Sequence, residues 1–178
     1  ISIDTGTMGG DSQARYILVK QTGASSNSLY VNEIQVMSGG INVALGKTAT
    51  ANPAYSVFGG YPASGVTNGS LVRDGNNGYA SNVNTTDNWV MVDLGSFFKI
   101  DAINVYALSV SAADVGNLNN VQVFVAPSDI SALSIAQLRS TAGVSTFGSI
   151  GSAAYLNPLS SNGLVYGSPV VSDTTPTL

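Results

Sequence analysis

The chain has 178 residues, enough for one sizeable hydrophobic core or two small ones. Charged residues make up only 9% of it and the net charge is −4, so no basic stripe is available for nucleic-acid phosphates or a polybasic membrane patch. Cysteine and histidine are absent, which excludes disulfides, thiol chemistry and histidine-dependent catalysis. The polar surface must be built mainly from neutral side chains, which suits neutral partners such as glycans, or packing in an assembly.

The N-terminal part of the chain predicts an arm followed by two strands. Residues 1–14 are rich in Gly, Ser and Thr, a composition typical of an arm or linker. Residues 15–20 form a compact apolar run with β-branched and aromatic side chains, which favours a strand. Residues 29–37 alternate with a period of two, so we expect a second strand, with Ile34 and Val36 facing the core.

A long structured loop is predicted over residues 51–66, where two Pro and three Gly fall among three aromatic residues. Loops of this length often carry function. The aromatic residues are Tyr55, Phe58 and Tyr61. Two interpretations stay open: they are exposed tips of the loop, or they fold back as a small satellite core.

Residues 71–94 are the stretch around which the rest of the chain is organised. They begin with a short apolar pair, followed by an Asp-Gly-Asn turn at 74–76 and a polar loop, and end in a strand that starts at Trp89. We expect Trp89, the only Trp, to belong to the core rather than to a ligand site. Further strands are predicted over residues 97–107, 121–125, 144–150 and 163–171. A short helix is predicted near 129–139, and 172–178 form a polar tail.

Together these elements predict an all-β fold, a β-sandwich of the jelly-roll type with one short helix near 129–139. Short apolar runs between Gly and Pro turns are typical of such a sandwich. We expect a single domain over residues 15–171. No apolar run approaches the roughly 20 residues of a transmembrane helix, so no membrane span is expected. The chain starts without Met, and we expect it to be a processed product or a piece of a longer polypeptide.

Four runs in the order 42–50, 71–76, 89–95 and 100–106 resemble the discoidin, or coagulation factor type C, domain. They are similar also to fucose-binding lectins and galactose-binding-like carbohydrate modules. The resemblance covers roughly residues 15–126. It implies a β-sandwich jelly roll that binds glycans, lipids or proteins without catalysis, outside the cell or on the surface of a particle such as a virion.

The segments within 15–37 look like strands that usually close such a domain at its C-terminus, yet here they come first. Two explanations stay open. The domain is circularly permuted and these strands close its own sandwich, or they complete a neighbouring copy by strand exchange. We expect closure within the chain.

The turn at 74–76 predicts a calcium site, because Ca²⁺ prefers carboxylate, amide and carbonyl oxygens. Asp74 and Asn76 stand two residues apart on a Gly turn and can point at one centre. The resemblance implies a structural calcium ion, completed by Glu33, the only Glu of the chain, and by carbonyls near Asn32, Leu71 and Gly78. The alternative is a plain turn in which Asp74 accepts local amide hydrogen bonds.

Sugar recognition of the fucose type is not expected, because the related lectins use a His and Arg residues after the calcium turn, and this chain has neither there. A different glycan site needs aromatic rings and a few amides or carboxylates. The candidate rings are Tyr55, Phe58, Tyr61 and Tyr79, and the candidate hydrogen-bonding groups are Asn82, Asn84 and Asp87. The alternative is an ordinary solvated loop.

These observations predict a non-catalytic binding or adhesion module, extracellular or on a particle surface, that recognises a glycan or surface polymer through loops at one end of the sandwich. Asp87 and Asp93 give no sign of a catalytic pair, and we expect Asp93 to make structural hydrogen bonds. The alternative is a coat, capsid-decoration or filament subunit that binds other copies of itself. Nucleic acid is not an expected partner.

Overall fold

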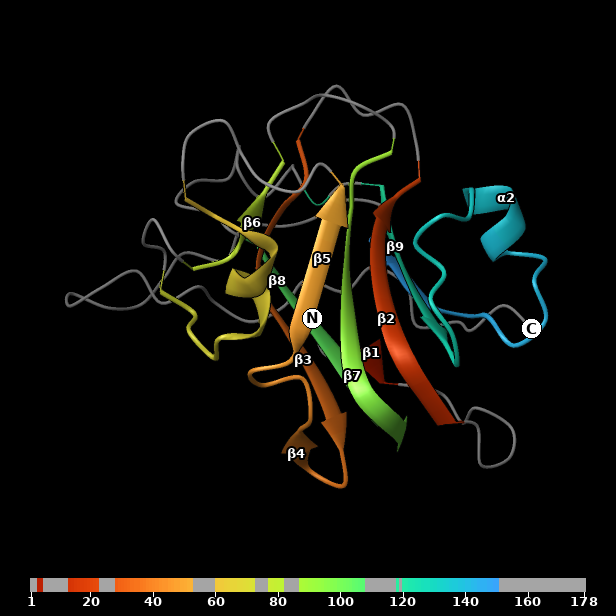
Figure 1. Cartoon of the computed structure of the whole chain (residues 1–178), viewed down its shortest axis with the longest axis horizontal. Helices are drawn as coiled ribbons and strands as arrows, with labels where there is room; N and C mark the ends of the chain where they lie inside the picture. The colour runs from red at the N-terminus through yellow and green to blue at the C-terminus, as the bar shows by residue number, and fades with distance from the viewer. Residues whose placement is uncertain are drawn as a thin grey trace.

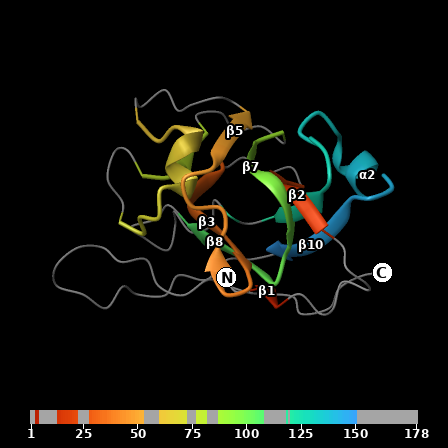
Figure 2. The same cartoon turned by 60° about the horizontal axis from the view of Figure 1, so that its bottom comes forward.

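The computed structural model describes residues 3–4, 13–22, 28–52, 60–72, 77–81, 87–107, 118 and 120–150. They form two antiparallel sheets packed face to face, with one short α-helix and one 3₁₀-helix (Figures 1 and 2). The predicted all-β sandwich is therefore confirmed. Among the described helices, none has the length and apolar character needed to cross a membrane.

Each sheet has five strands. The first sheet runs in the order β1 (Ile3–Asp4), β8 (Ala102–Ala107), β3 (Tyr30–Ser38), β4 (Ile41–Asn42), and β6 (Tyr79–Ala80) also pairs with β3. The second sheet runs in the order β10 (Ser145–Ile150), β9 (Val121–Ala126), β2 (Gln13–Gln21), β7 (Trp89–Lys99), β5 (Thr48–Asn52). The two strands predicted within 15–37 are β2 and β3, and both pair inside this chain with neighbours on each side.

The main core lies between the sheets and follows the period of two predicted for the strands. On β3, Ile34 and Val36 are wholly buried, as their alternation indicates. On β2, Ile17 and Val19 face the same core. Leu18 points the other way, into a second cluster that covers the outer face of the second sheet. Strand β2 is therefore buried on both faces, which explains its almost continuous apolar run.

The outer cluster is closed by residues 127–144, which cross the outer face of the second sheet. Ile130 and Leu138 pack there against β2, β7 and β9. The helix in this segment, α2 (Ile135–Leu138), is shorter than the predicted 129–139. Ser134 caps it by accepting a hydrogen bond from the Gln137 N–H, which fixes its start. The preceding residues form a turn instead, in which the Asp129 carboxylate accepts from the Ser131 N–H at 2.8 Å.

Three further segments differ from the sequence prediction. The strand predicted over 97–107 is divided, because β7 continues to Lys99 and β8 begins at Ala102. At the turn between them, the Asp101 N–H donates to the Met37 carbonyl at 2.8 Å. The predicted arm contains the short strand β1, and the predicted loop 51–66 contains the start of the 3₁₀-helix η1 (Ala63–Thr67). Residues 163–171 and 172–178 lie outside the described residues.

Asp93 has the structural role expected from its pattern. Arg15 Nε donates to Asp93 Oδ1 at 2.6 Å and Arg15 Nη2 donates to Oδ2 at 2.7 Å, which links β2 to β7. The Gly95 N–H also donates to Oδ1, at 2.8 Å. The hydrogen bonds from Arg15, followed by the one from Gly95, hold the pKa of Asp93 below its usual value of 3.8.

Replacing Asp93 with Asn is expected to lower the melting temperature at neutral pH, and the deficit should shrink as the solution is acidified. A carboxyl whose pKa is lower in the folded state stabilises the fold above its unfolded value of 3.8, and this contribution is lost as the pH falls. Thermal unfolding of both proteins between about pH 7 and pH 2 measures the difference. A deficit of constant size across that range would contradict the ionic role of Asp93.

Candidate functional site

A bulge in β3 brings two neighbouring polar side chains into the protein interior. The pairing of β3 with β8 shifts register between Val31 and Glu33, so Asn32 is the extra residue on β3. Side chains on a regular strand alternate between faces, but Asn32 and Glu33 are both wholly buried. The alternation in the sequence placed Asn32 and Glu33 on opposite faces, and the bulge interrupts that alternation at Asn32.

Each buried side chain makes one hydrogen bond to the backbone of residues 69–70. Glu33 Oε1 accepts from the Gly69 N–H at 3.1 Å, and Asn32 Nδ2 donates to the Ser70 carbonyl at 3.2 Å. Within the described part of the chain, Glu33 Oε2 and Asn32 Oδ1 are buried and have no hydrogen-bond partner. Burial, partly offset by the Gly69 hydrogen bond, raises the pKa of Glu33 to about 8. Two unsatisfied oxygens of this kind fit a cation.

The segment that holds the Asp-Gly-Asn turn is tied down on both sides next to these oxygens. Asn77 Nδ2 donates to the Val72 carbonyl at 2.9 Å and to Ser70 Oγ at 3.0 Å. Asn68 Nδ2 donates to Asn77 Oδ1 at 2.6 Å. Asp74 and Asn76 themselves lie outside the described residues. The chain therefore leaves and re-enters the described structure at two anchored points beside β3.

Gly78 lets the chain come unusually close to β3. Its φ is +84°, and a Cβ at this position would lie 2.6 Å from the Val31 carbonyl oxygen and 2.8 Å from Asn32 Cα. Only glycine fits such a contact at positive φ. Leu71, on the other side of the predicted turn, is half-buried.

The described residues fit part of a calcium site rather than a complete one. They supply the carboxylate of Glu33 and the amide oxygen of Asn32, which was predicted to contribute through its carbonyl. No cluster of three or more acidic, His or Cys residues occurs among the residues that the structure describes. The further carboxylate that was predicted, Asp74, lies outside them.

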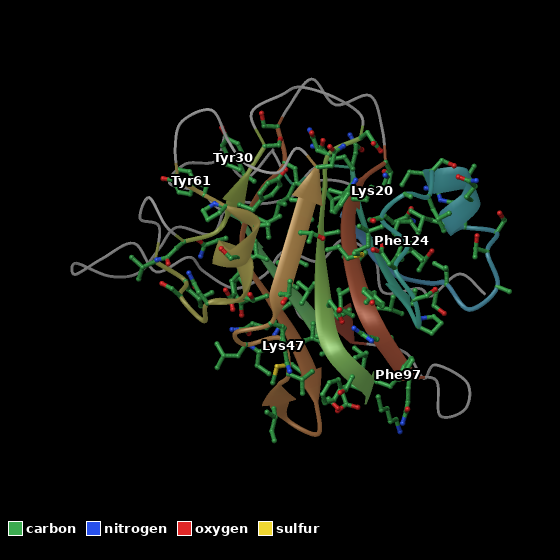
Figure 3. All side chains as sticks on the ribbon, in the orientation of Figure 1. Lys20, Tyr30, Lys47, Tyr61, Phe97 and Phe124 are labelled. Carbon is green, nitrogen blue, oxygen red and sulfur yellow. The ribbon has the colours of Figure 1, made fainter. Side chains whose placement is uncertain are left out.

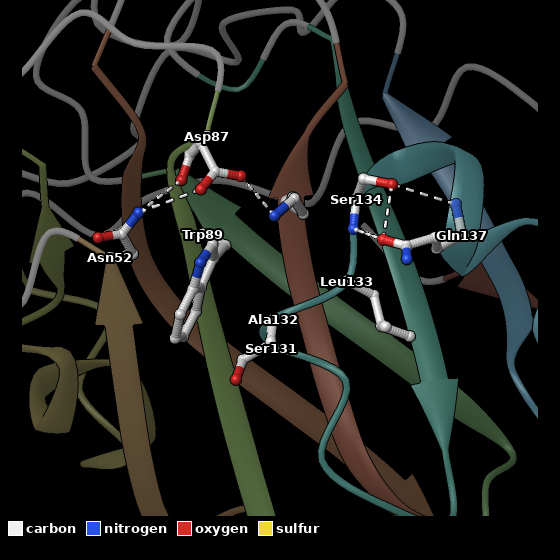
Figure 4. Close-up of a pocket in the computed structure, with 9 residues that line it drawn as sticks. Asn52, Asp87, Trp89, Ser131, Ala132, Leu133, Ser134 and Gln137 are labelled. Atoms are coloured by element: carbon white, nitrogen blue, oxygen red, sulfur yellow. Dashed lines mark hydrogen bonds and ion pairs between the residues drawn. The ribbon is translucent and has the colours of Figure 1, made fainter.

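A second candidate site is a pocket of about 480 Å³ between the outer face of the second sheet and the segment before α2. Trp89 forms one wall of this pocket, here called the Trp89 pocket, and Ala132 and Leu133 lie opposite (Figure 4). The other lining residues are polar: Lys20, Asn52, Asp87, Ser131, Ser134 and Gln137. A concave site with one aromatic ring and several polar groups suits a small polar ligand.

Asp87 organises the polar side of the Trp89 pocket. Lys20 Nζ donates to Asp87 Oδ1 at 2.6 Å, and Asn52 Nδ2 donates to the Asp87 carbonyl at 3.1 Å and to Oδ2 at 3.4 Å (Figure 4). Lys20 is nearly buried, with 3% of its side chain exposed, whereas 63% of the Asp87 side chain is exposed. These contacts fix the ends of β2, β5 and β7 at one end of the sandwich.

Of the predicted ligand-binding residues, the structure places only Asp87 in the Trp89 pocket. Tyr61 is half-buried beside β6, where its carbonyl accepts from the Ala80 N–H, and Figure 3 shows it away from Lys20. Tyr79 is wholly buried in the main core, so its ring cannot serve as an exposed sugar platform. Its place on β6, paired with β3, is what buries it. Tyr55, Phe58, Asn82 and Asn84 lie outside the described residues.

Sequence reasoning missed Trp89, Lys20 and Asn52 as pocket residues. Trp89 was expected in the core, but it is half-buried and only packs against the outer cluster from its edge. The signal that Trp89 could line a pocket was its position at the first residue of a strand, directly after a polar loop. No local signal marks Lys20, because its burial depends on pairing between β2 and β7.

No protein-family model matches the chain, and neither a curated protein nor a solved structure matches it. The resemblance to the discoidin domain therefore rests on the four runs quoted above and stays a prediction.

Proposed function

We propose that the chain is a non-catalytic binding module, extracellular or on a particle surface, that recognises a glycan or surface polymer through the loop end of its sandwich. The observation that carries this proposal is the Trp89 pocket. Its half-buried indole lies next to carboxylate, amide and hydroxyl groups, the combination that sugars require. The aromatic ring offers an apolar surface to a sugar ring, and the polar groups exchange hydrogen bonds with hydroxyls.

The position of the pocket also supports this function. Segment 53–59 leaves the described structure at Asn52, and segment 82–86 re-enters it at Asp87. These segments carry four of the predicted ligand-binding residues. The hydrogen bond between Asn52 and Asp87 holds the two departure points together beside Trp89.

A glycan array tests the proposal. The purified chain is expected to bind one group of glycans, and Trp89→Ala is expected to weaken that binding at least about tenfold, since a well-packed aromatic contact contributes on the order of 1–3 kcal/mol. Phe97→Ala is the matched control, because Phe97 is an exposed aromatic residue at the other end of the same strand. Melting temperatures of both variants show whether they fold. An array without any bound glycan would overturn the proposal.

The same proposal includes a structural calcium ion that pins the loop at 74–76. Glu33 and Asn32 would hold it from β3, Asp74 and Asn76 from the turn, with carbonyls near Leu71 and Gly78. The support is the pair of buried, unsatisfied oxygens on Glu33 and Asn32. A bound cation would offset the cost of burying the Glu33 carboxylate. Calorimetric titration of chelator-treated protein with CaCl₂ tests for such a site directly.

A second candidate is a coat, decoration or filament subunit that binds copies of itself. It is favoured by large apolar side chains in contact with solvent: Ile41 is 69% exposed, Leu45 57% and Phe97 52%. Such side chains would be covered where one copy of the chain contacts another. Sizing and electron microscopy test this candidate. Ordered polymers from a protein that binds no glycan would favour it over the binding module.

A further inference from the structure

The Trp89 pocket carries no net charge. Lys20 and Asp87 are the only charged side chains among the described residues that line it, and each neutralises the other at 2.6 Å. Because the Lys20 side chain is only 3% exposed, its ammonium group faces Asp87 rather than the open pocket. The exposed part of the pair is the Asp87 carboxylate. The charged group that an entering ligand meets is therefore negative.

The neighbouring segments do not alter this balance. Residues 53–59 and 82–86, which adjoin the pocket in sequence, contain no Asp, Glu, Lys or Arg. Two other cations, Arg15 on β2 and Arg139 at the end of α2, are bound elsewhere. Arg15 pairs with Asp93, and Arg139 donates to Gln122 Oε1 at 2.8 Å. The described pocket thus offers no unpaired cation to an acidic ligand.

We propose that the Trp89 pocket selects neutral pyranose sugars and rejects acidic ones such as uronates and sialates. This inference rests on the proposed glycan-binding function and names its ligand class. A neutral ring can lay its apolar C–H face on Trp89 and give hydroxyl protons to the Asp87 carboxylate. The carboxylate of an acidic sugar would instead lose water without gaining a cation, and would lie near Asp87.

The intrinsic fluorescence of the protein gives a direct test. Trp89 is the only Trp of the chain, so a change in tryptophan emission reports on this pocket. We would titrate the full chain with the methyl glycosides of galactose, glucose, mannose and fucose, and with glucuronic acid and N-acetylneuraminic acid. At least one neutral sugar is expected to shift the emission with a Kd about tenfold or more below that of either acid, a discrimination typical of one unfavourable charge.

Charge variants test the cause of the selectivity. Asp87→Asn leaves Lys20 without its counter-charge, and the ratio of acidic to neutral affinity should rise at least about tenfold. The double variant Lys20→Met/Asp87→Asn removes both charges and should return to a preference for neutral sugars. Only Lys20 of the pair is buried, and Met replaces its side chain with an apolar one of similar size that needs no counter-charge, so the double variant should fold even if Asp87→Asn does not. Melting curves check each protein.

The outcomes separate this inference from the proposed function. Equal or tighter binding of the acids, or an unchanged ratio in folded Asp87→Asn, would overturn the inference and leave glycan binding intact. Array binding that Trp89→Ala does not weaken, together with unchanged emission, would also overturn it by placing the ligand elsewhere. A glycan array without any bound ligand would overturn the proposed function, and this inference with it.

Discussion

Replacing Gly78 with alanine is expected to destabilise the protein by about 3 kcal/mol or more. Two costs add. A non-glycine residue at a φ of +84° is strained, by about 1–2 kcal/mol. The new Cβ would also lie 2.6 Å from the Val31 carbonyl oxygen, so the backbone of β3 or of the loop must move. The midpoint of urea unfolding measures the sum.

Gly39→Ala is the matched control for the backbone strain alone. Gly39 has a φ of +57°, and a Cβ there would meet nothing within 4 Å. Its substitution is expected to cost only about 1 kcal/mol. The difference between the two variants isolates the contact between Gly78 and β3. Equal losses in both variants would contradict that contact, and with it the position of residues 77–78 beside Asn32.

The sandwich itself could be predicted because its strands carry local signals. The alternation in 121–125 and 29–37 gave β9 and β3, and the almost continuous apolar run gave β2. The sequence prediction assigned Lys99 to the strand that ends at residue 107, whereas it belongs to β7. The turn between the two strands is held by the hydrogen bond from Asp101 to Met37 on β3, a contact that no local pattern reveals. The start of α2 was also hard to predict. Several side chains near residues 129–139 could cap a helix, and only the structure shows that Ser134 does so.

The candidate sites were harder to predict because they depend on register and on covering segments. The burial of Glu33 together with Asn32 follows from a bulge against β8, which no pattern within β3 reveals. Tyr79 looked like any loop aromatic residue, and only the pairing of β6 with β3 makes it part of the core. The Trp89 pocket exists because residues 131–137, far along the chain, cross the outer face of the second sheet.

In the presence of a chelator, the stability of the protein is expected to fall by about 4 kcal/mol between about pH 4.5 and pH 8, since one pKa unit corresponds to about 1.4 kcal/mol. Burial raises the pKa of Glu33 from 4.5 to about 8 in the folded state. Below 4.5 the carboxyl is protonated in both states, so the full stability is present. As the pH rises through this window the unfolded chain ionises first, and folding is progressively disfavoured.

Glu33→Gln is expected to remove this loss, because a neutral amide of the same shape does not titrate. The variant should therefore be more stable than the wild type at about pH 8 in chelator. With CaCl₂ the order should reverse, because a cation bound by the ionised carboxylate stabilises only the wild type. Urea unfolding of both proteins at several pH values, with EDTA or with CaCl₂, measures all four conditions.

Asp101→Asn controls for the loss of one negative charge, because Asp101 is exposed on the turn after β7. Its response to calcium should equal that of the wild type. The two halves of the argument can fail separately. A wild-type stability in EDTA that is flat between about pH 4.5 and pH 8 would contradict a buried carboxylate without a cation. A clear loss across that range that CaCl₂ leaves unchanged would keep the buried carboxylate and overturn the calcium site. Only a pH-dependent loss that calcium reverses in the wild type and not in Glu33→Gln supports both.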